Sequence, residues 1–223
     1  MNRYETVVSS GYQQAASANK VLKNTYMLLS ATLFFSAVMA MISMALNVPS
    51  IAYIISVIAS MVLGIFVLPR TANSTSGIGV IFLITGLLGF GLGPILSTYL
   101  ALPNGPQTIA TAFGGTGIIF LGLSGYALTS KRDFSFMGGF LFAGMMVLVI
   151  GMLANLFLQM PLLSLAISGG IILVMSGFIL FDTARIVRGG ETNYIMATYG
   201  LFLSIFNIFI SLLQILGIFG NDE

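Results

Sequence analysis

The 223-residue sequence contains no cysteine, no histidine and no tryptophan. Without cysteine there is no disulfide and no thiolate ligand, and without histidine there is no imidazole ligand and no histidine base for a catalytic triad. Charged residues make up only 6% of the chain, which is too few to cover a surface that faces water. These absences exclude most soluble enzymes, and the sequence predicts no catalytic residue, no metal site and no cofactor.

Long apolar runs take the place of the missing charges. Hydrophobic residues form 57% of the chain and the mean hydropathy is +1.05, which is typical of an integral membrane protein. Each run is close to the roughly 20 residues that cross a bilayer as a helix, and the alternation expected of barrel strands is missing. The sequence therefore predicts an all-α bundle of seven membrane-spanning helices. The predicted spans are 25–46, 51–69, 78–100, 107–129, 134–158, 161–184 and 195–219.

The eight Lys and Arg residues are thinly spread, and the net charge of only +2 argues against a nucleic-acid partner. All eight fall on one side of the predicted bundle, namely Arg3, Lys20, Lys23, Arg70, Lys131, Arg132, Arg185 and Arg188. Because positive charge favours the cytoplasmic side, the N-terminus is predicted inside and the C-terminus outside, in the periplasm. This divides the chain into a flexible cytoplasmic tail (1–24), a membrane domain (25–219) and a short periplasmic end (220–223).

Glycine is abundant, with 26 residues that lie mostly inside the spans. Gly89 and Gly93 have the four-residue spacing that lets two membrane helices approach closely, so we expect them to serve helix packing. The GGTG segment at 114–117 lacks the lysine and the hydroxyl residue of a phosphate-binding loop, which excludes nucleotide binding there.

The segment FDTARIVRGGETNY carries the only acid in the spans, Asp182. A retinal protein would need a lysine in the last span, and an aspartyl protease would need a second acid at membrane depth; the sequence has neither. Two interpretations of Asp182 remain open. It can anchor the helix end by an ion pair with Arg185, one turn further on. It can instead act as a proton-sensitive gate, with Arg70 as a second candidate partner.

The last span carries a polar stripe at helical spacing. Its members are Ser204, Asn207, Ser211 and Gln214. Since lipid penalises unpaired polar groups, this face should point into the bundle. The stripe is either a set of interhelical hydrogen bonds or the lining of a path for ions or protons.

Several segments resemble the Bax inhibitor (transmembrane Bax inhibitor motif) family. They are LGFGLGPIL (88–96), IATAFGGTGIIF (109–120), FDTARIV and LFLSIFNIFISLLQILG, and the similarity covers about 20–219. The resemblance implies a seven-helix bundle and, for some bacterial members, a pH-sensitive calcium leak gated by two aspartates on the sixth and seventh helices. Asp182 matches the first aspartate, but the second falls at Ser204, so the coupling of two carboxylates is lost here.

Within the family, the segments VLKNTYMLLSATLFFSA, SKRDFSFMGG and GGETNYI are most similar to a bacterial inner-membrane subgroup named for modulation of the FtsH protease. This resemblance implies a non-enzymatic regulator that binds and restrains FtsH, with or without its accessory membrane proteins. The polar segment 1–24 is expected to be disordered and able to reach the protease. The rival expectation, from another class, is a pH-sensitive calcium or proton leak channel.

Overall fold

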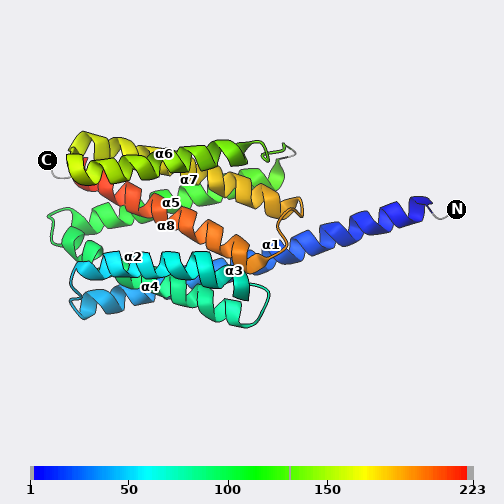
Figure 1. Ribbon diagram of the computed structural model, residues 1–223, viewed down its shortest axis with the longest axis horizontal. Coiled ribbons are helices and arrows are strands. Elements are labelled where there is room, and N and C mark those ends of the chain that lie inside the picture. Colours follow the sequence, from blue (N-terminus) through cyan, green and yellow to red (C-terminus); the bar gives the residue numbers. More distant parts are fainter. Residues whose placement is uncertain (1–2, 131, 220–223) are drawn as a thin grey trace.

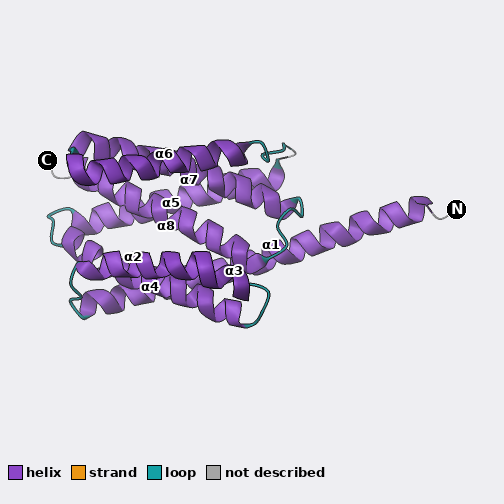
Figure 2. Ribbon diagram, in the orientation of Figure 1, coloured by secondary structure: helices purple, strands orange, loops and turns teal. Residues whose placement is uncertain are grey.

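The computed structural model describes residues 3–130 and 132–219, with side chains placed from residue 16 to residue 218. This part of the chain is helical and contains no strand (Figure 1; Figure 2). The elements are α1 (Arg3–Ala45), α2 (Ile51–Val62), the π-helix η1 (Leu63–Val67), α3 (Leu68–Thr71), α4 (Ser76–Leu100), α5 (Gly105–Thr129), α6 (Met137–Leu158), α7 (Pro161–Val187) and α8 (Tyr194–Phe219).

Seven helices in the described part of the chain are long and apolar enough to cross a membrane, which confirms the predicted bundle. The second of these spans, Ile51–Thr71, consists of α2, η1 and α3 joined without a break. The predicted ends of spans two to seven lie within three residues of the observed ends. Apolar run length and loop punctuation were therefore sufficient to locate these helices.

The first helix differs from the expectation for residues 1–24. The sequence predicted a disordered tail, whereas α1 is helical from Arg3 and continues without interruption into the span that begins at Ala16. Its first turns project beyond the ends of the other helices (Figure 1). The segment has no proline and one glycine, Gly11, and adding turns to an existing helix avoids the cost of nucleation. The extension of the span helix back to Arg3 therefore requires no separate nucleation.

The π-helix η1 marks a local widening of the second span. The backbone N–H of Leu68 donates to the carbonyl oxygen of Leu63, five residues back. Pro69 follows directly and has no N–H to continue the ordinary ladder. Beside this turn, a side chain at Gly64 would overlap the Tyr199 hydroxyl of α8. The glycine thus leaves a notch in which the Tyr199 ring end packs.

The contact between α1 and α4 is the most extensive between two helices of the bundle. A Cβ atom at Gly89 would overlap the backbone carbonyl oxygen of Ser36, and one at Gly93 would overlap the hydroxyl of Ser43. Both serines are buried. The helices approach so closely because both glycines lack side chains, which confirms the packing interpretation of this pair.

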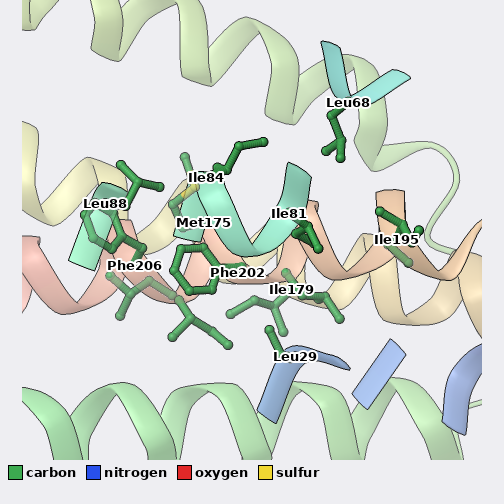
Figure 3. Packing of buried hydrophobic residues seen from close by; sticks show 14 of the residues in the cluster. Leu29, Leu68, Ile81, Ile84, Leu88, Met175, Ile179, Ile195, Phe202 and Phe206 are labelled. Carbon is green, nitrogen blue, oxygen red and sulfur yellow. The ribbon is translucent and has the colours of Figure 1, made fainter. Parts of the chain in front are cut away.

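The largest hydrophobic cluster surrounds α8, which contacts α1, α4, α5 and α7. Phe202 lies near its centre, with Ile81 of α4, Ile179 of α7 and Leu29 of α1 around it (Figure 3). In contrast, α6 packs mainly on α7 and has one buried residue, Leu141. The helices α4 and α8 therefore form the inside of the bundle, and α6 lies at its edge.

Candidate functional site

Three loops that contain or closely follow a positively charged residue lie at one end of the bundle, together with the projecting start of α1 (Figure 1). They are the loops 72–75, 130–136 and 188–193, and we call this the basic end; Lys131, within the second loop, lies outside the described residues. The loops 46–50, 101–104 and 159–160 lie at the opposite end and carry no lysine or arginine. This arrangement agrees with the charge distribution read from the sequence.

Asp182 lies in the last turns of α7 and faces α8. A Cβ atom added at Gly200 would lie 3.0 Å from Oδ2 of Asp182, so the carboxylate sits directly against the α8 backbone. The next residue, Thr183, is fully buried and its hydroxyl lies 3.4 Å from that of Ser124 in α5. Asp182 therefore points toward α8, while its neighbour Thr183 lies against α5.

The expected ion pair between Asp182 and Arg185 is not formed. The Arg185 guanidinium instead lies 3.1 Å from the carboxylate of Glu191 and donates from Nε to the carbonyl oxygen of Gly190. Arg70 is exposed at the end of α3, and no ion pair joins it to any described residue. Among the described residues, neither Arg185 nor Arg70 forms an ion pair with Asp182, but Arg185 lies close enough for its charge to act on that carboxylate.

The loop 188–193 connects the other two loops of the basic end. On one side, Arg188 forms an ion pair of 3.2 Å with Asp133 in loop 130–136. On the other side, the Asn193 side-chain amide donates to the carbonyl oxygen of Ala72, at 3.0 Å, and to Oδ1 of Asn73, at 2.8 Å. The short, polar loop 188–193 therefore links the three loops of the basic end.

Hydrogen bonds from Ser135 stabilise the ionised carboxylate of Asp133. Its Oδ1 accepts hydrogen bonds from the hydroxyl and from the backbone N–H of Ser135, at 2.6 and 2.9 Å. These two bonds lower the pKa of Asp133, and the charge of Arg188 lowers it further. The side chain is 63% exposed, so water surrounds the rest of it and its ion pair with Arg188 is a weak one.

Asn193 is the functional residue of this region that the sequence interpretation missed. Besides the bonds to the loop 72–75, its Oδ1 accepts from the backbone N–H groups of Ile195 and Met196, at 2.9 and 3.1 Å. These bonds cap the N-terminus of α8. An asparagine directly before a long apolar run is a capping signal that could have identified this role; the bridge to loop 72–75 carries no such signal.

The polar stripe of α8 lies partly inside the bundle, since Ser204 and Ser211 are each 3% exposed. The Ser204 hydroxyl donates to the carbonyl oxygen of Gly200, one turn back on the same helix. Gln214 makes the bond between helices, because its Oε1 accepts from the Ser168 hydroxyl of α7 at 2.8 Å. Asn207 donates within α8, to a carbonyl oxygen four residues back. Two of the four stripe residues, Ser204 and Asn207, thus donate within α8, and Gln214 accepts from α7.

This arrangement defines a multi-pass membrane protein with a single acid among its spans and its cationic loops at one end. Among the described residues, no group of three or more Asp and Glu side chains could hold a metal ion. A family model described as inhibitor of apoptosis-promoting Bax1 matches residues 18–221. The chain belongs to this family, the Bax inhibitor family.

Bacterial relatives match over nearly the whole chain. It is 51% identical to an uncharacterized membrane protein of Vibrio cholerae over 215 residues, 96% of each chain. It is 50% identical over 220 residues to the Escherichia coli protein named modulator of FtsH protease YccA, which covers 98% of this chain and 100% of that one. An uncharacterized protein of Pseudomonas aeruginosa is 44% identical over the full length of both.

These relatives confirm the resemblance to YccA. The same protein in a second Escherichia coli strain, also 50% identical, is named inner membrane protein YccA. Together with the seven spans, this similarity places the protein in the bacterial inner membrane as a multi-pass protein. None of the relatives described here is named as an enzyme.

Proposed function

We propose that this protein binds and restrains the FtsH membrane protease, alone or with the protease's accessory membrane proteins, and has no catalytic activity of its own. The observation that carries the proposal is the 50% identity, from end to end, with a protein named modulator of FtsH protease. The absence of histidine and cysteine from the chain supports a role through binding. A second candidate function is the conduction of calcium or protons.

The projecting start of α1 supports a mechanism for this restraint. Residues 3–15 precede the span that begins at Ala16, and at 1.5 Å per residue they reach roughly 20 Å beyond it. A processive protease must first grip a segment near a chain end. A helix that leaves the bundle opens more readily than one packed within it. We therefore propose that residues 3–15 are the handle, and that extraction of the seven apolar spans behind them occupies the protease.

The handle requires the basic end to face the cytoplasm, as positive charge favours. The chain has no cysteine, so single cysteines report topology directly. We expect a cysteine at exposed Thr192 to react with a membrane-impermeant thiol reagent only from the cytoplasmic side, and one at exposed Asn104 only from the periplasmic side. Labelling of Asn104→Cys from the cytoplasm alone would reverse the orientation.

Deletion of residues 2–15 tests the handle, because it ends before the span and leaves the bundle intact. We expect the variant to fold, to persist longer than the wild type in cells that contain FtsH, and to lose much of its effect on degradation of a reporter substrate. A matched control replaces the same residues with an unrelated Gly/Ser-rich segment of equal length, which should restore turnover. Unchanged turnover of the deletion variant would disprove the handle; failure of the two purified wild-type proteins to associate would disprove the function itself.

A second candidate function is an ion leak, favoured by the position of Asp182 against Gly200, one turn from Ser204. An aspartate at Ser204 would place two carboxylates where like charges oppose joint ionisation. We expect Ser204→Asp in calcium-loaded vesicles to produce a calcium flux that depends steeply on pH. The control is Ser211→Asp, on the same buried face two turns further on. Equal flux from both variants and the wild type would count against this candidate.

A further inference from the structure

A pocket of about 320 Å³ opens at the basic end, between the loop 130–136 and the last turns of α7. Its apolar part is formed by Phe134, Phe181 and Ala184. Two of these, Phe134 and Ala184, are buried and belong to a small hydrophobic cluster separate from the main core. The inner part of the pocket is therefore apolar and firmly packed.

The polar part of the pocket carries charges of both signs. Arg185 lies in the last turn of α7 and Arg188 directly follows the helix, and both line the pocket together with Asp133. Their side chains are partly open to solvent, with 48% of Arg185 and 37% of Arg188 exposed. Two guanidinium groups that line one pocket can bind the oxygens of a single phosphate.

The pocket spans the boundary between hydrocarbon and water. Arg185 lies near the end of the membrane-spanning helix Pro161–Val187, whereas Asp133 lies in the loop beyond the spans. Phe136, the last residue of the loop, and Phe140, in the first turn of α6, are 80% and 76% exposed. Since α6 lies at the edge of the bundle, these two rings point away from the bundle, toward lipid. A lipid molecule can thus enter the pocket from the side without leaving its leaflet of the bilayer.

Arg185 has N–H donors left for such a ligand. Each guanidinium carries five N–H donors, and the structure shows Arg185 using one on Glu191 and one on Gly190. Asp133 is held by Ser135 whether or not Arg188 is near. A phosphate between the arginines would release the Asp133 carboxylate from Arg188. That carboxylate would then be unpaired at the pocket rim, where a cationic group of the same ligand can bind it.

We propose that this pocket binds a membrane phospholipid whose headgroup contains a phosphodiester and a primary ammonium, such as phosphatidylethanolamine. The phosphate lies between Arg185 and Arg188, the ammonium donates to Asp133, and the glycerol end lies against Phe134 and Phe181. A headgroup without an amine satisfies the arginines but not the carboxylate. The site does not depend on the proposed restraint of a protease.

Native mass spectrometry of the purified full chain, with phosphatidylethanolamine, phosphatidylglycerol and phosphatidylcholine in equal amounts, tests this site. We expect the wild type to retain phosphatidylethanolamine in preference to the other two lipids. The variant Arg185→Gln/Arg188→Gln should bind it about tenfold more weakly, because two charged donors are lost. Asp133→Asn should bind phosphatidylethanolamine and phosphatidylglycerol equally. The control Arg70→Gln, at the same end but outside the pocket, should behave like the wild type.

Three results would overturn the proposal. They are a preference of the wild type for phosphatidylglycerol, an unchanged preference in Asp133→Asn, and displacement of the lipid by inorganic phosphate, which would make free phosphate the ligand. Should the double arginine variant fail to fold, Asp133→Asn still tests the proposal, because this side chain is 63% exposed and does not belong to the buried cluster around Phe134.

Discussion

Replacing Gly89 with alanine is expected to destabilise the bundle, whereas a methyl group added to α4 at an open position should not. The new Cβ atom would overlap the carbonyl oxygen of Ser36 and lie 2.6 Å from its hydroxyl oxygen. A backbone carbonyl cannot rotate away as a side chain can, so α1 and α4 must separate. Overpacking of this kind costs about 1–3 kcal/mol. We expect a clear fall in the thermal unfolding midpoint of the purified protein.

The matched control for Gly89→Ala is Gly79→Ala on the same helix, because no atom lies within 4 Å of a Cβ built at Gly79. In the middle of a helix, alanine is favoured over glycine by about 0.8–1.0 kcal/mol. The control should therefore be as stable as the wild type or more stable. If the two variants unfolded at the same temperature, the close approach of α1 and α4 would be wrong.

Replacing Asn193 with alanine is expected to have an effect of similar size, because one side chain performs two tasks. Loss of the cap on α8 costs about 1 kcal/mol. Loss of the two bonds to Ala72 and Asn73 adds about 1 kcal/mol for each bond. We expect a lower unfolding midpoint and faster proteolysis in the loops 72–75 and 188–193, measured by limited digestion.

Asn193→Asp separates the two tasks of this residue. An aspartate still accepts from the backbone N–H groups of Ile195 and Met196, and its charge favours the N-terminus of a helix. It cannot donate to the carbonyl oxygen of Ala72. We expect α8 to remain stable and the loop 72–75 to become more accessible. Equal accessibility of that loop in both variants and the wild type would show that the bridge contributes nothing.

The span positions could be predicted from the sequence, because each depends on a local run of apolar residues. The partner of Arg185 could not. The spacing of three residues puts Arg185 beside Asp182 on a straight helix, but the chain turns at Gly189, whose φ of 73° is left-handed. That turn brings Gly190 and Glu191 back to Arg185. Loop geometry, which helical periodicity does not describe, decided the pairing.

The glycine contacts also show which features could be predicted from local sequence and which could not. Four-residue spacing correctly indicated that Gly89 faces another helix, because that pattern is local. The notch at Gly64 depends on Tyr199, far along the chain, and on the widened turn before Pro69. The pocket beside Arg185 and Arg188 likewise combines residues of two loops and a helix end. These long-range contacts depend on the tertiary arrangement of the helices, which local sequence patterns do not describe.

The unbroken path of α1, from its projecting start to its packed span, has a mechanical consequence. A force applied near Arg3 acts along the axis of one stiff rod, and that rod lies against α4 over much of its membrane length. The load therefore acts in shear, so the contacts at Ser36 and Ser43 must slide past Gly89 and Gly93 at nearly the same moment. The projecting turns open first, and the load then reaches these contacts through the packed part of the helix. A motor that starts at this end therefore meets its main resistance at the span, after the projecting segment has yielded.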